Sequence, residues 1–143
     1  NFNEEWQAFW AQASQSPSGT MLMSLEGLNW NDSAKAVDFA NDGPYRVYVW
    51  QPNPGKSAAV YAAFKEAAKM HAAMGAKVNI YQEGVGGTGK VHYVLTFDDW
   101  AGMADFGDKV SASEEFRFLQ AAFADAATPI ASVQGEPLYY TGR

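Results

Sequence analysis

The residues of this chain that could do proton chemistry near neutral pH include His92, which is one of only two histidines in 143 residues. An unperturbed imidazole titrates close to neutrality, so it can accept or donate a proton there. Asn79 lies in the preceding β-type run, and its amide could hold a developing oxyanion. We take His92 and Asn79 as candidate catalytic residues. The sequence places no carboxylate to orient His92, so a structural, hydrogen-bonded histidine is the alternative.

Side chains alternate between the two faces of a strand, and this rule separates two kinds of position. Aliphatic positions such as Val47, Val49 and Ile80 are predicted to face the helices. The remaining positions combine polar and aromatic groups on a mixed face, which consists of Arg46, Tyr48, Trp50, Asn79, Tyr81, His92, Thr96, Ser132 and Gln134. Both a ligand cavity and a dimer interface contain such mixtures, and both interpretations stay open.

The candidate ligand-binding residues come from this mixed face and from one helix. They are Arg46, Tyr48, Trp50, Tyr81, Thr96 and His71. His71 belongs to an apolar stripe with Val60, Phe64, Ala67 and Met74, spaced by three and four residues as on one helix face. The stripe predicts a packed core histidine, which would contact a ligand if the helix end reaches the cleft.

The elements that would position these residues follow the order β-α-β-β-α-β. Strands are predicted over 45–51, 77–82, 90–97 and 130–134, and the Gly-rich stretch 84–89 reads as a hairpin connection. The first helix is expected to begin with Ser57 as its cap and to end at Gly75. Asp98 and Asp99 can cap the second helical region.

We expect Gly107 to interrupt that second region, and a capping box of Ser111 and Glu114 to restart it. The order predicts an α+β, ferredoxin-like fold, with an antiparallel sheet and both helices on one face.

Two domains are expected, an N-terminal segment over 1–44 and the ferredoxin-like domain over 45–143. The pair Glu4-Glu5 is followed by a Pro and an apolar strand near 21–25, as Glu114-Glu115 is followed by Pro129 and the last strand. This similarity suggests either a remnant of a preceding repeat or an unrelated helix with an added edge strand. Residues 29–44 read as a linker. Because the chain begins with Asn1, we expect a processed form or a piece of a longer polypeptide.

Composition argues against several classes of function. The chain has no cysteine, which excludes disulfides and thiolate chemistry, and two histidines without a paired carboxylate motif predict no metal site. The net charge of −6 without a basic cluster argues against nucleic acid. No apolar run approaches a membrane span. Gly55-Lys56-Ser57 imitates a phosphate-binding loop, but the position that needs glycine is Trp50.

The assembled elements resemble the dimeric α/β-barrel superfamily, in particular NIPSNAP-like and antibiotic-biosynthesis-monooxygenase-like proteins. The resemblance covers Tyr45 to Tyr140, with Pro54-Gly55-Lys56 after the first strand and Trp100 after Asp98-Asp99. It implies two ferredoxin-like units whose sheets pack face to face, as a homodimer or a tandem pair.

We therefore hypothesise a small-molecule binding protein, in its most concrete form a cofactor-independent oxygenase that acts on an aromatic or apolar ligand without a resident cofactor. The alternative is a non-catalytic module for self-association, which the five tryptophans favour. Whether the chain is an enzyme, and whether it is cytoplasmic or secreted after processing, stays open at this point.

Overall fold

The computed structural model describes residues 2–13, 15, 22–28 and 43–137. The elements in chain order are α1 (Phe2–Ala13), β1 (Leu25–Gly27), β2 (Tyr45–Pro52), α3 (Ser57–Ala73), β3 (Lys77–Glu83), β4 (Val91–Thr96), α4 (Trp100–Ala112), α5 (Glu114–Phe123) and β5 (Ala127–Gly135). From β2 to β5 the fold is the predicted ferredoxin-like order, with the second helical region divided into α4 and α5. The predicted linker over 29–44 lies outside the described residues except for its last two positions.

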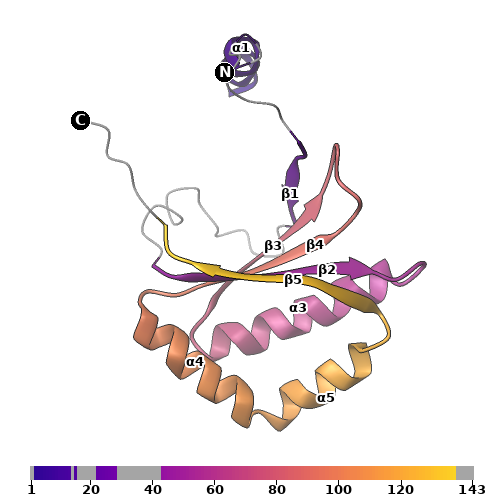
Figure 1. The fold of residues 1–143 in the computed structure, drawn as a ribbon, viewed down its shortest axis with the longest axis vertical. Coiled ribbons are helices and arrows are strands. Elements are labelled where there is room, and N and C mark those ends of the chain that lie inside the picture. The colour runs from indigo at the N-terminus through magenta and orange to yellow at the C-terminus, as the bar shows by residue number, and fades with distance from the viewer. Residues whose placement is uncertain (1, 14, 16–21, 29–42, 138–143) are drawn as a thin grey trace.

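The strands form one antiparallel sheet in the order β1-β3-β4-β2-β5. Helices α3, α4 and α5 all lie against the same face of this sheet (Figure 1). β1 is the additional strand, and it extends the sheet beyond β3, with Leu25 opposite Glu83. The N-terminal helix is present as α1, whereas Met21, at the start of the predicted N-terminal strand, lies outside the described residues.

The core lies between the sheet and the helices. From β4, Val91, Tyr93 and Leu95 are buried, and from α3, Val60 and Phe64 meet them. β4 is the middle strand of the sheet, so its alternate residues have helix on one side and neighbouring strands on both edges. The apolar stripe of α3 was predicted from its spacing, and its burial confirms that prediction.

The helix boundaries differ from the sequence predictions at three points. Ser57 is the first residue of α3, and Lys56 precedes it without a side-chain cap. Gly107 does not interrupt α4, which continues to Ala112. Ser113, not Ser111, caps α5 by accepting a hydrogen bond from the Phe116 backbone N–H at 3.1 Å. The cap at Asp99 is confirmed, because its carboxylate accepts from the Gly102 backbone N–H at 2.7 Å.

The break between α4 and α5 has a local cause. Ser113 has an extended backbone (φ −79°, ψ 111°), so the chain leaves the helical conformation for one residue and begins a new helix with a capped end. A serine oxygen at this position satisfies one of the N–H groups that the first turn of a helix leaves without a partner. α5 can therefore take a different direction from α4, and it lies below α3 in the view of Figure 1.

Candidate functional site

A cavity of about 130 Å³ lies between the sheet and the three helices that cover it. We call it the helix-side cavity. Its lining is almost entirely apolar, and it combines residues of β2, β4, α3, α4 and α5: Tyr48, Trp50, Ala63, Phe64, Ala67, His71, Tyr93, Leu95, Phe106, Val110, Phe116, Leu119, Gln120 and Phe123. A concave apolar site with a few polar groups is the usual form of a small-molecule site.

Small residues on α3 leave the space, and aromatic rings from the other elements surround it. Ala63 and Ala67 both line the cavity on α3, where a larger side chain would fill it. Between them Phe64 packs edge to face on Trp50, with ring centroids 6.3 Å apart, and on Tyr93 at 5.1 Å. The ring centroid of Phe123 on α5 lies 5.3 Å from that of Phe64. Such aromatic contacts hold the walls in place.

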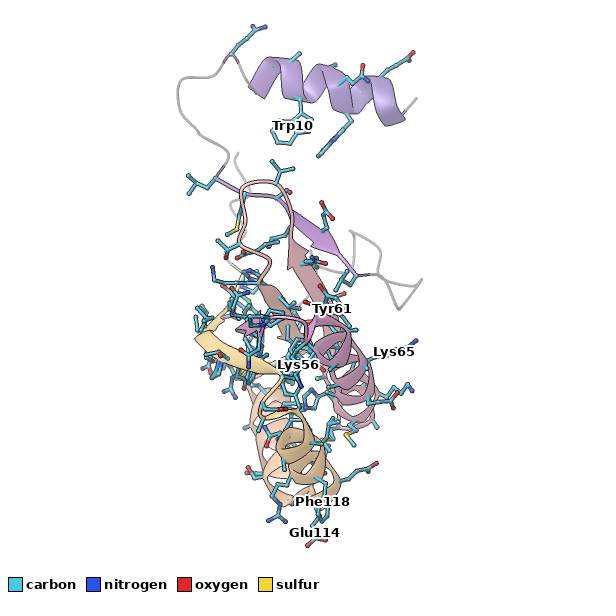
Figure 2. The ribbon with its side chains drawn as sticks, turned by 90° about the vertical axis from the view of Figure 1, so that its right-hand side faces the viewer. Trp10, Lys56, Tyr61, Lys65, Glu114 and Phe118 are labelled. Atoms are coloured by element: carbon cyan, nitrogen blue, oxygen red, sulfur yellow. The ribbon has the colours of Figure 1, made fainter. Side chains whose placement is uncertain are left out.

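Helix α5 forms one wall of the cavity, although its own side chains are little buried. It contributes Phe116, Leu119 and Phe123 to the lining, yet none of its residues is fully buried. Its outer side carries Phe118, which is 75 % exposed and points away from the body of the protein (Figure 2). Helices that bury little apolar surface are among the first parts of a structure to open.

His71 is a deeply buried polar residue of the cavity wall. Only 6 % of its surface is exposed, and its Nδ1 lies 2.9 Å from the hydroxyl oxygen of Tyr93. Burial lowers the pKa of His71 to about 4, so the imidazole is neutral at physiological pH. Burial also raises the pKa of Tyr93 well above the usual tyrosine range, which keeps its phenol protonated. The wall therefore carries no charge at this point.

Among the described residues, the Nε2 atom of His71 has no hydrogen-bond partner. The ring instead lies against two phenylalanines, with centroids 5.2 Å from Phe106 and 4.7 Å from Phe116. The stripe of α3 predicted a packed core histidine, and the burial of His71 confirms that prediction. That His71 contacts a ligand stays a prediction.

The prediction that nine residues share one mixed face is wrong for strand β2. Tyr48 is directly opposite Tyr93 on β4, and directly opposed residues lie on the same side of a sheet. Since Tyr93 contacts His71 of α3, Tyr48 faces the helices, and Trp50 follows it two residues later. Both line the helix-side cavity. The aliphatic residues Val47 and Val49 therefore lie on the other face, contrary to prediction.

Arg46 shares the helix side with Tyr48 but does not line the cavity. Its guanidinium donates to Gln134 Oε1 at 2.7 Å and to the Tyr48 hydroxyl at 3.4 Å. The register pairs Arg46 with Gln134 and Tyr48 with Ser132. These two residues of β5 therefore also lie on the helix side of the sheet, contrary to the predicted mixed face. Arg46 thus fixes the position of a lining tyrosine.

The other candidate residues lie on the opposite side of the sheet, which we call the open face. Its members alternate with the core residues of each strand: Val47, Val49, Asn79, Tyr81, His92, Val94, Thr96, Ala131 and Val133. Helices α3, α4 and α5 are all on the other side (Figure 1). The structure thus divides the predicted residues, with Tyr48, Trp50 and His71 at the cavity and His92, Asn79, Tyr81 and Thr96 on the open face.

A carboxylate does orient His92, contrary to the expectation from the sequence. Glu83, at the end of β3, places Oε1 3.2 Å from His92 Nε2. The carboxylate is buried, and its Oε2 accepts from the Thr88 backbone N–H at 2.7 Å, the Thr88 hydroxyl at 3.1 Å and the Lys90 backbone N–H at 3.3 Å. The β3–β4 hairpin loop therefore holds one oxygen of Glu83, while the other oxygen faces the imidazole and lies 3.9 Å from the Lys90 ammonium.

These contacts determine the ionisation of Glu83. Burial alone would raise its pKa, but the hydrogen bonds from the Thr88 backbone, His92, the Lys90 backbone and the Thr88 hydroxyl together lower it to about 2.

A residue two positions along an antiparallel partner strand is a diagonal neighbour on the same face. That spacing, applied to the hairpin, was the signal that could have found Glu83 from the sequence.

Within the described ranges, no group of three or more histidine, aspartate or glutamate side chains could hold a metal ion. In the same residues no helix is long and apolar enough to cross a bilayer.

No family model matches the sequence, and no curated protein matches it either. The fold, however, is similar to that of a solved structure, a NIPSNAP family protein of unknown function from Agrobacterium tumefaciens strain C58. The TM-score is 0.60 at 10 % sequence identity, over 71 % of this chain and 94 % of that chain. At this identity the similarity concerns the fold alone. It confirms the resemblance predicted from the element order, and the fold of this chain is NIPSNAP-like.

Proposed function

We propose that this protein binds a small, neutral, apolar molecule in the helix-side cavity. The observation that carries the proposal is a cavity of about 130 Å³ with walls of aromatic rings and no lysine or arginine among its lining residues. An engineered cavity of roughly 150 Å³ in another protein binds benzene, which sets the scale of the ligand at about one aromatic ring.

The energetics support a ligand rather than an idle gap. Apolar side chains that face an unfilled space lack the contacts that they would make in a packed core. A side chain larger than Ala67 would fill part of this space, yet the sequence has alanine there and at Ala63. A ligand of the right size would recover the missing contacts on binding.

Toluene binding tests the proposal directly, with two alanines of α3 as a matched pair. Ala67 lines the cavity, whereas Ala62 is exposed on the same helix. We expect Ala67→Leu to fill the cavity and weaken toluene binding at least tenfold, and Ala62→Leu to leave it unchanged. Isothermal calorimetry and the melting temperature with and without toluene measure both effects. Equal binding by the two variants would contradict the proposal.

A second candidate function is proton transfer on the open face, and the Glu83–His92 pair favours it. A carboxylate that orients an imidazole is the arrangement of a general base. In this version, the cofactor-independent oxygenase expected from the sequence would act on a phenolic substrate beside His92, Asn79 and Tyr81. Oxygen uptake with phenolic substrates tests it. We expect His92→Gln to lower any such rate by about 10²-fold, and a rate unchanged in that variant would exclude the pair from catalysis.

Self-association through the open face is the third part of the proposal. Several of its members are aliphatic or aromatic, and Val133 is 51 % exposed. An apolar sheet face of this kind is a candidate for contact with a second copy or with another domain of similar fold.

A further inference from the structure

The hydrogen-bonding state of His71 says more about the ligand than the shape of the cavity does. The phenol proton of Tyr93 is buried and needs an acceptor, and among the described residues its contact is His71 Nδ1 at 2.9 Å. When Tyr93 donates to Nδ1, the neutral imidazole carries its own proton on Nε2. The opposite tautomer would satisfy Nδ1–H but leave the phenol proton without an acceptor. The structure therefore favours Nε2–H.

That Nε2–H group is a buried donor, and among the described residues no acceptor lies within hydrogen-bonding distance of it. Buried polar groups in native proteins almost always have partners, so each exception requires an explanation. One explanation is a weak contact between the N–H and the ring of Phe116, whose centroid is 4.7 Å from that of the imidazole. Another is an acceptor that belongs to the ligand.

The surroundings of the imidazole allow a ligand to reach it. Phe116 packs against the imidazole with ring centroids 4.7 Å apart, but it is only half-buried, and it belongs to α5, which has no fully buried residue. A rotation of the Phe116 ring, or a small shift of α5, would expose Nε2 to the cavity that both residues line. His71 itself is held by Tyr93 and by Phe106, so it would stay in place.

We propose that the helix-side cavity takes a neutral compound of about one ring that carries a carbonyl oxygen, and that His71 Nε2–H donates a hydrogen bond to this oxygen once Phe116 moves aside. This inference rests on the proposed binding function and names the chemical class of its ligand. A carboxylate is disfavoured, because no cationic side chain lines the cavity to compensate for its desolvation.

Three probes of similar size separate this inference from the binding function itself: toluene, acetophenone and benzoate. We expect the wild-type protein to bind acetophenone about fivefold more tightly than toluene, which corresponds to one additional net hydrogen bond, and to bind benzoate most weakly. Competition calorimetry gives the three dissociation constants. In His71→Phe, the preference for acetophenone over toluene should disappear.

Tyr61→Phe is the control, since Tyr61 is on the same helix but does not line the cavity, and it should keep the preference. Nitrogen-15 NMR of the imidazole gives an independent measurement on the wild-type protein, which should show Nε2–H in the absence of any probe. A protonated Nδ1, equal affinities for toluene and acetophenone, or benzoate as the tightest probe would each overturn the carbonyl inference alone. Failure of all three probes to bind would overturn the binding function as well.

Discussion

At the scale of single residues, His71 connects stability to pH. Its pKa is lowered to about 4 in the folded protein from an ordinary value of 6.5. The unfolded chain therefore binds a proton at a higher pH than the folded chain does. The contribution of His71 to the free energy of unfolding is fully present above pH 6.5. It is lost as the pH decreases toward 4, by roughly 3 kcal/mol in total. Urea unfolding at pH 7, 5.5 and 4 measures the slope.

The variant His71→Phe provides the comparison for this prediction. It has no titrating group at this position, so the loss of stability between pH 6.5 and 4 should become smaller by about the same amount. If the free energy of unfolding of His71→Phe depends on pH as steeply as that of the wild-type protein, other residues cause the pH dependence.

Glu83 acts in a different pH range. Its pKa is about 2 in the folded protein and ordinarily 4.5, so the stability it contributes is present above pH 4.5 and is lost as the pH falls toward 2. Glu83→Gln places an amide N–H₂ where Thr88, Lys90 and His92 all donate. We expect it to destabilise the protein by about 1–3 kcal/mol at pH 7.

Glu66 offers the matched control for this substitution, since its carboxylate pairs with Lys69 at the exposed surface of α3. Glu66→Gln should change the free energy of unfolding by less than about 0.5 kcal/mol. Urea titration measures the free energy of unfolding of both variants. Equal decreases in this free energy would mean that the hairpin contacts of Glu83 contribute little to stability.

At the scale of elements, the start of α5 controls one wall of the cavity. Ser113→Ala removes the hydroxyl that accepts from the Phe116 N–H, and it should cost about 1 kcal/mol. Amide hydrogen exchange should accelerate over Glu114–Phe123 more than over α4. Ser111→Ala is the control, because the exposed Ser111 hydroxyl donates to the Gly107 carbonyl within α4, and it should change stability by less than about 0.5 kcal/mol.

The sequence predicted the elements well where a periodic pattern or a turn residue was strong. The stripe of α3 and the cap at Asp99 are examples, and the fold follows from the order of these elements. The cap at Ser113 was missed because Ser111 with Glu114 matches the capping-box pattern, whereas the residue three positions after Ser113 is Phe116. Only the backbone conformation of the residue between the two helices decides which serine is used.

The site was harder to predict, because its location depends on which face of β2 meets the helices. Aliphatic residues were assigned to the core and aromatic residues to the open face, but Trp50 and Tyr48 span the space between sheet and helices, where large rings are needed. Val49 on the open face reflects β-propensity as much as burial. The partner of His92 depends on hairpin register, which strand assignment alone did not supply.

At the scale of the whole molecule, the open face predicts the state of association. Val94 lies near the middle of this face, between Val47 and Asn79. We expect a dimer in light scattering at micromolar concentration and a monomer for Val94→Lys, because a buried unpaired charge is unfavourable at an interface. Lys65→Glu on the outer side of α3 should stay dimeric (Figure 2). A monomeric wild-type protein would contradict the prediction.

The helix-side cavity also has a consequence for how the protein responds to hydrostatic pressure. Unfolding removes internal voids, so a protein with a cavity of about 130 Å³ decreases in volume when it unfolds, by an amount on the order of tens of mL/mol. Compression should therefore unfold this chain at lower pressure than the variant Ala67→Leu, in which leucine occupies part of the void. Bound toluene should raise the unfolding pressure of the wild-type protein, as Ala67→Leu does. The unfolding pressure would therefore report whether the cavity is filled.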